Sequence, residues 1–210
     1  PGTGPNLLLL HGWESSTARW KPYLKDLRER QFNVYAIDAP AHGLSGGKYF
    51  TPELYADAIA HVTSKFNIHI IIGHSVGAYA TLIYCKRPGR AESLNNLILL
   101  APTGRIRAFM NRFFDILNLN NKIRSKYFDN FKALYKHDLK YYDSDNLVKG
   151  MGLPGLLIHD KDDKTLPYSD SVLVAENWDG VQFITTKGYG HRLKSTEVKK
   201  YIMDYLDKSI

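Results

Sequence analysis

Six short apolar runs, rich in Val, Ile and Leu, recur along the chain. Continuous runs of this length are typical of strands that are buried on both faces of a parallel sheet. We therefore predict strands at 6–10, 33–37, 68–72, 97–100, 155–158 and 181–184.

Amphipathic segments lie between these runs, with apolar positions three to four residues apart. This spacing is typical of helices with one buried face. Helices are predicted at about 17–30, 52–65, 76–87, 168–177 and 195–208. The alternation of strand and helix predicts an α/β fold, with an open, mostly parallel sheet and helices on both faces.

One interval, between positions 100 and 155, contains no run that predicts a strand. Its segments 106–117 and 123–135 have helical spacing, and the interval is rich in Phe and Tyr. We predict a short helical cap over the carboxyl ends of the strands, where open α/β sheets bind ligands. The predicted division is an α/β core at 1–102 and 147–210 and a cap insertion at 103–146.

The chain has 210 residues, the size of one large domain, and a formal net charge of +7. Residues 103–149 hold ten Lys or Arg against five Asp or Glu, so most of the excess lies in the predicted cap. Without a recognised nucleic-acid-binding motif, this charge favours a basic soluble enzyme over a nucleic-acid partner. The oligomeric state is left open.

No apolar run approaches the roughly 18 residues that a membrane helix needs, so no stable membrane insertion is expected. Cys85 is the only cysteine, which excludes an intrachain disulfide and a four-cysteine zinc site. This cysteine usage favours a reducing compartment, and we expect a cytoplasmic protein. The chain begins at Pro1 rather than Met, which indicates a processed or truncated product.

The segment Gly73-His74-Ser75-Val76-Gly77 joins a predicted strand to a predicted helix. This G-x-S-x-G pattern predicts a nucleophile elbow, in which a sharp turn lifts the serine hydroxyl above the sheet edge. The flanking glycines let the strand and the helix approach each other. The Val76 amide then lies at a helix N-terminus, where it can stabilise an oxyanion.

A serine nucleophile needs a base and a group that orients the base. His191, in a glycine-flanked loop between the last strand and the last helix, is the candidate base. The segment after the fifth strand offers Asp160, Asp162 and Asp163 as candidate acids. The chain order Ser, Asp, His is that of α/β-hydrolases.

The chain resembles the α/β-hydrolase superfamily, and in particular its small bacterial esterase-like serine hydrolases. The motifs that carry the resemblance run through most of the chain. They are His11-Gly12-Trp13, the D-x-P-x-H-G turn at 38–43, the elbow at 73–77, the segment from His159 to Pro167, and the G-x-G-H loop that ends at His191.

The resemblance implies a Ser75, Asp163 and His191 triad, because the family's acid aligns with Asp163. It also implies an oxyanion hole formed by the backbone amides of Trp13 and Val76. The family usually has two antiparallel strands before the strand at 6–10, and only five residues precede it here, so these N-terminal strands are expected to be missing.

From these residues we expect a carboxylic ester hydrolase that acts on a small-molecule ester through an acyl-enzyme intermediate. No cofactor and no metal are expected. The cap aromatics Phe109 and Phe113 are candidate substrate contacts. His11, His42 and His159 are interpreted as residues that hold loops by hydrogen bonds.

Two alternatives remain open. The same fold supports amide, thioester or carbon–carbon hydrolysis and lyase reactions. Carbon–carbon hydrolysis would need cationic groups for an anionic substrate, and Arg105 and Arg107 are the nearest candidates. The second alternative is a ligand-binding or signalling protein with slow turnover.

Overall fold

The computed structural model of the chain describes residues 2–135 and 137–209. Its centre is a six-stranded sheet in which all paired strands are parallel. The sheet confirms the predicted open α/β fold. Its strands are β1 (Asn6–Leu10), β2 (Asn33–Ile37), β3 (Ile70–His74), β4 (Asn96–Leu100), β5 (Gly155–Asp160) and β6 (Val181–Thr186).

The predicted boundaries agree closely with these strands except at β3. That strand begins at Ile70 and continues through His74, later than the predicted 68–72. The reason is the ladder with β4, in which His74 still pairs with Leu100. The strand therefore extends to the residue before the predicted nucleophile.

The strand order is β2-β1-β3-β4-β5-β6, so the first strand of the chain lies next to the edge of the sheet. From β1 it moves outward to the edge strand β2 and then returns to place β3 on the other side of β1. In open α/β sheets, ligands bind at the carboxyl ends of the strands where the order reverses in this way. That crevice lies beyond β1 and β3.

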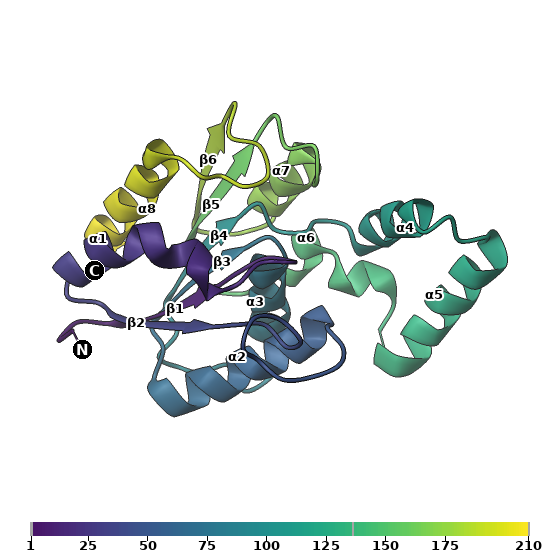
Figure 1. Ribbon diagram of the computed structural model, residues 1–210, viewed down its shortest axis with the longest axis horizontal. Coiled ribbons are helices and arrows are strands. Elements are labelled where there is room, and N and C mark those ends of the chain that lie inside the picture. The colour runs from purple at the N-terminus through teal and green to yellow at the C-terminus, as the bar shows by residue number, and fades with distance from the viewer. Residues whose placement is uncertain (1, 136, 210) are drawn as a thin grey trace.

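The helices cover both faces of the sheet (Figure 1). Side chains of α2, α3 and α7 join one apolar cluster, and those of η1, α1 and α8 join the other. No helix among the described residues is long and apolar enough to cross a membrane. The bounds are η1 (Thr17–Tyr23), α1 (Leu24–Glu29), α2 (Pro52–Phe66), α3 (Val76–Lys86), α7 (Tyr168–Glu176) and α8 (Thr196–Ser209).

The interior strand β1 shows why its apolar run has no alternation with polar residues. Leu8 and Leu10 belong to the cluster under α2 and α3, whereas Leu7 and Leu9 belong to the cluster under α1 and α8. All four side chains are fully buried. A strand covered on both faces has to be apolar at every position.

The described residues between β4 and β5, which leave out position 136, form helices and no strand, as their pattern predicted. They are α4 (Ile106–Ile116), α5 (Asn121–Tyr135), the 3-10 helix η2 (Leu139–Tyr142) and α6 (Ser144–Leu147). Figure 1 shows α4 and α5 projecting on the side to which β1 and β2 point. Side chains of this segment, including those of Phe131 and Tyr142, join the same apolar cluster as α2 and α3. Its separation as a distinct cap domain at 103–146 stays a prediction.

Gly77 allows the first turn of α3 to lie against the end of β1. A Cβ atom at this position would lie 2.5 Å from the His11 carbonyl oxygen and 2.9 Å from that of Leu10. We expect Gly77→Ala to lower the free energy of unfolding by about 1–3 kcal/mol, measured by urea denaturation, because the backbone must shift. The control is Gly46→Ala, since no heavy atom lies within 4 Å there. Equal stability of both variants would contradict the close approach.

Candidate active site

Ser75 sits at a strained turn between β3 and α3. Its φ of 55° and ψ of −122° are unusual for a residue with a side chain. The backbone is held on both sides, because the Ser75 amide donates to the Leu100 carbonyl at 2.9 Å and the Ser75 carbonyl accepts from the Tyr79 amide at 3.0 Å. A Cβ at Gly73 would lie 2.7 Å from the Ala78 backbone, so this turn tolerates only glycine there. These contacts hold the serine in the elbow geometry that its motif predicted.

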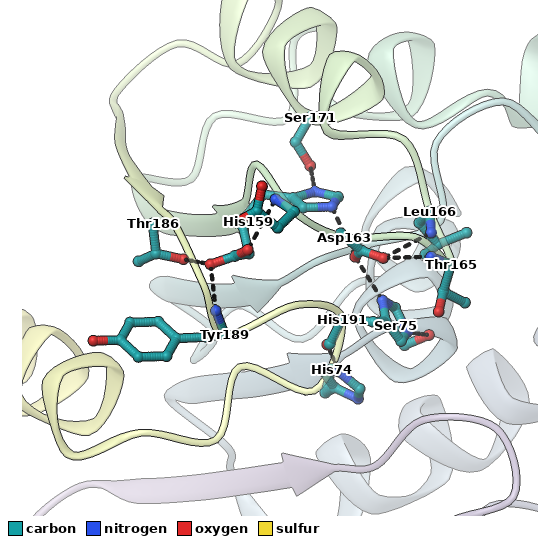
Figure 2. A network of polar contacts seen from close by, with 12 residues as sticks. His74, Ser75, His159, Asp163, Thr165, Leu166, Ser171, Thr186, Tyr189 and His191 are labelled. Atoms are coloured by element: carbon teal, nitrogen blue, oxygen red, sulfur yellow. Dashed lines mark hydrogen bonds and ion pairs between the residues drawn. The ribbon is translucent and has the colours of Figure 1, made fainter.

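The structure brings Ser75, His191 and Asp163 into one hydrogen-bonded line (Figure 2). His191 Nδ1 lies 2.7 Å from Asp163 Oδ2, and His191 Nε2 lies 3.0 Å from Ser75 Oγ. Because a carboxylate only accepts, Nδ1 carries the proton and donates it. The lone pair of Nε2 is then directed at the serine hydroxyl. This is the arrangement in which an imidazole can take the proton of a serine.

Asp163 is a fully buried carboxylate that accepts four hydrogen bonds. Oδ1 accepts from the amides of Thr165 and Leu166, at 2.7 and 2.9 Å. Oδ2 accepts from His191 and, at 3.0 Å, from His159 Nε2. Burial by itself would raise the pKa of Asp163, but the hydrogen bonds from His159, His191 and the Leu166 amide outweigh it and lower that pKa. The carboxylate therefore stays charged beside His191.

The other candidate acids have different partners. Asp160 Oδ2 accepts from the Thr186 hydroxyl at 2.7 Å and from the Tyr189 amide at 3.0 Å. It thereby ties the end of β6 to the loop that carries His191. Asp162 contributes its amide to the same turn, since that amide donates to Asp160 Oδ1 at 2.9 Å.

Two further side chains hold the His191 loop by donating hydrogen bonds to two consecutive backbone carbonyls. His74 Nε2 donates to the His191 carbonyl at 2.9 Å, and the Arg19 guanidinium donates to the Arg192 carbonyl at 2.8 Å. Burial lowers the pKa of His74 well below its ordinary value, so the ring is neutral. Sequence reasoning missed both contacts, because no motif links residues so far apart in the chain.

The predicted oxyanion residues flank Ser75. Gly12 packs against the elbow, since a Cβ there would lie 3.0 Å from Ser75 Cβ, and Trp13 follows directly. Val76 is the first residue of α3, so its amide is one of those that have no partner within the helix. The oxyanion-binding role of the Trp13 and Val76 amides stays a prediction.

His11 and His42 hold the loops near Trp13. His11 Nε2 accepts from the Ala39 amide at 2.8 Å, and His42 Nδ1 lies 3.0 Å from the Pro40 carbonyl. The Trp13 indole packs edge-on against His42, with ring centroids 5.4 Å apart. These contacts agree with a loop-holding role for both histidines.

The candidate substrate contacts lie outside this hydrogen-bonded group. Phe109 and Phe113 are on α4, and Phe113 is 42% exposed. The Arg107 guanidinium lies 4.4 Å from the ring centroid of Phe128, so it packs within the helical segment. Substrate contacts by Phe109, Phe113 and Arg105 stay predictions.

Other groups offer little competing chemistry. Among residues 2–135 and 137–209, no group of three or more His, Cys, Asp or Glu side chains is placed to hold a metal ion. Burial raises the pKa of the Cys85 thiol to about 12. Because the thiolate is the reactive form, Cys85 is a poor nucleophile.

Residues 5–151 match the family described as "Serine aminopeptidase, S33". The pimeloyl-[acyl-carrier protein] methyl ester esterase of Pseudoalteromonas atlantica is 33% identical over 81 residues, which cover 36% of this chain and 30% of that protein. The match thus spans less than a third of that relative. The bifunctional esterase/perhydrolase DCH of Acinetobacter calcoaceticus is 22% identical over 253 aligned residues, covering 98% of this chain and 92% of the relative.

Solved structures with the same fold include the alpha/beta hydrolase domain-containing protein 10 from mouse. The TM-score is 0.77 at 15% identity, with 99% of this chain and 90% of that chain covered. At this level of identity the likeness concerns the fold. It supports the α/β-hydrolase architecture that the sheet order and the elbow already indicate.

We expect acid to destabilise the chain partly through Asp163. Because its pKa is lowered in the folded chain, the carboxylate stabilises the fold above the ordinary aspartate pKa of about 3.9, and this stabilisation is lost as the pH falls further. Urea denaturation between pH 6 and pH 2 should show a smaller decrease in the free energy of unfolding for Asp163→Asn than for the wild type. The variant should be less stable at pH 6, since an NH₂ group replaces one carboxylate oxygen and cannot accept the two hydrogen bonds that this oxygen receives.

The matched control is Asp179→Asn, which changes an exposed aspartate and should leave the slope unchanged. A wild-type slope in Asp163→Asn would refute the link between this carboxylate and acid stability.

Proposed function

The chain belongs to the serine aminopeptidase S33 family of the α/β-hydrolase superfamily, and from this premise we propose that it is a hydrolase of carboxylic esters. The proposal depends above all on one observation, the hydrogen-bonded line from Ser75 Oγ through His191 to Asp163, with distances of 3.0 and 2.7 Å. These two hydrogen bonds connect a nucleophile to a base and the base to a buried acid, as in a serine hydrolase triad.

In the proposed reaction, Ser75 Oγ attacks the ester carbonyl while His191 Nε2 takes the hydroxyl proton. The tetrahedral oxyanion accepts hydrogen bonds from the amides of Trp13 and Val76. Collapse of this intermediate breaks the ester bond, and His191 returns the proton to the leaving alcohol. Water then attacks the acyl-enzyme, with His191 again as the base, and releases the acid and Ser75.

Asp163 keeps its charge throughout this sequence. Its four hydrogen bonds hold it in place, and it stabilises the imidazolium that forms on His191. The protonated form of Asp163 is disfavoured, as the lowered pKa indicates. The carboxylate therefore orients the base and does not itself take part in proton transfer.

The choice of an ester is supported by two relatives whose names describe esterases. The match to the methyl ester esterase covers 36% of this chain and 30% of that relative. The match to the esterase/perhydrolase covers nearly all of both chains. Amide hydrolysis is the second candidate, because the matched family is described as an aminopeptidase. A small-molecule ester as substrate and a cytoplasmic location stay predictions.

The first test compares the wild type with Ser75→Ala on p-nitrophenyl acetate and butyrate. We expect a decrease in kcat of roughly 10⁴-fold or more, because the nucleophile is lost while the rest of the site remains. A fluorophosphonate probe should label the wild type at Ser75 and leave the variant unlabelled. The circular dichroism spectra of the two proteins should coincide.

The control is Ser64→Ala, which removes an exposed hydroxyl on α2 and should leave kcat unchanged. An amino-acid p-nitroanilide, tested in parallel, separates ester from amide hydrolysis. Retention of wild-type ester hydrolysis by Ser75→Ala would refute the proposed mechanism. Faster cleavage of the anilide than of the esters would favour the amide candidate.

A further inference from the structure

The geometry points to His159 as a positioning residue that shares the Asp163 carboxylate with His191 and sets the pH at which His191 becomes protonated. The inference rests on the proposed function, because it concerns the same acid and base. It assigns to His159 more than the loop-holding role that its place in the sequence suggested.

Two imidazole rings converge on one carboxylate oxygen. His159 Nε2 lies 3.0 Å from Asp163 Oδ2, and His191 Nδ1 lies 2.7 Å from the same oxygen. Figure 2 shows that the rings reach it from different elements, His159 from β5 and His191 from the loop after β6. The His159 ring is fully buried, so water does not compete for this hydrogen bond.

The other nitrogen of His159 is also hydrogen-bonded. His159 Nδ1 lies 2.6 Å from the hydroxyl of Ser171, which is buried on α7. Because the Asp163 carboxylate only accepts, the His159 ring proton lies on Nε2, and the Ser171 hydroxyl then donates to Nδ1. The ring of Tyr168 packs edge-on against His159 at 6.0 Å between centroids and restricts its rotation. A neutral donor is thereby held in one orientation against Asp163.

This donor changes the field that His191 experiences. A hydrogen bond from a neutral group withdraws negative charge from Asp163 Oδ2, the oxygen that stabilises a protonated His191. Without His159, the carboxylate would stabilise the imidazolium more strongly. His191 would then take up its proton at higher pH and lose its function as a base there. A residue that only fills space would not produce this change.

The other charged and titratable groups around His191 make hydrogen bonds that do not involve the His159 side chain, and we expect these bonds to remain when His159 is replaced. His74 packs against His191 at 5.0 Å between ring centroids, and burial keeps it neutral. Arg19 and Asp160 bind the backbone of the His191 loop. Lys161 lies 6.0 Å from the ring centroid of Tyr168. A shift in the His159 variants is therefore attributed to the lost hydrogen bond on Asp163.

The test measures the rate of labelling by a fluorophosphonate probe between pH 5 and pH 9 in the wild type, His159→Gln and His159→Leu. The glutamine keeps an N–H donor near the position of Nε2, whereas leucine fills the space without one. We expect His159→Leu to move the acid limb up by about 0.5–1 pH unit and to lower the plateau rate roughly 10- to 100-fold, because Asp163 is less well oriented. His159→Gln should keep the wild-type midpoint.

Two further variants separate this effect from a general loss of stability. Ser171→Ala removes the hydroxyl that donates to His159 Nδ1, so the His159 ring is less firmly held, and the variant should shift the midpoint in the same direction by a smaller amount. Leu157→Ala removes a fully buried side chain from the same strand and should lower the Tm without moving the midpoint. Ser171→Ala and His159→Gln carry the test if His159→Leu fails to fold.

A second measurement needs no reaction. NMR of ¹⁵N-histidine-labelled protein reports the tautomer of His159 and the midpoint of the His191 titration. We expect His159 to be protonated at Nε2, and the His191 midpoint to rise in His159→Leu and Ser171→Ala. An unchanged midpoint in the folded variants, or a proton on Nδ1 of His159, would overturn the inference. A shifted midpoint in a protein that the probe never labels would refute the proposed function and leave the inference on His159 standing.

Discussion

The buried charge of Asp163 is the constraint on which the candidate site depends. A carboxylate that is withdrawn from water is costly unless its oxygens are hydrogen-bonded. Here the donors are the Thr165 and Leu166 amides and two histidines. The turn after β5 therefore has to close around the carboxylate, and the loop after β6 has to bring His191 to it. The position of the His191 ring thus follows from the hydrogen bond that the buried Asp163 carboxylate needs.

Ser75 imposes a second constraint from the other side of the site. Its strained backbone is possible because strand pairing fixes β3 up to His74 while α3 begins at Val76. The reversal of strand order at β1 and β3 places this turn beside the loop that carries Trp13. Three segments that are distant in the sequence therefore meet at one edge of the sheet. His74 links the serine to the base, since it is the last residue of β3 before Ser75 and its ring donates to the His191 carbonyl.

The helical segment between β4 and β5 is linked to this framework by packing. Its inner aromatics share an apolar cluster with α2 and α3, and the Arg112 guanidinium donates to the Thr165 carbonyl in the turn that holds Asp163. Its outer surface carries much of the chain's positive charge. This helical segment is thus in direct contact with the turn that holds Asp163.

The sequence by itself determined the strands, the helices, the elbow and the chain order of serine, aspartate and histidine. These features depend on local apolar periodicity and on short motifs, which are visible in any window of the chain. The residue pattern offered three aspartates as candidate acids, and only the family resemblance selected Asp163. The sequence also placed the third strand slightly too early and gave His74 and His159 no specific partner. Only the tertiary structure showed where that strand ends and which groups the two histidines contact. The contacts join residues 28, 116 and 117 positions apart in the cases of Asp163 with His191, Ser75 with His191, and His74 with His191. Such pairings depend on strand order and on the burial of charge, which no local pattern records.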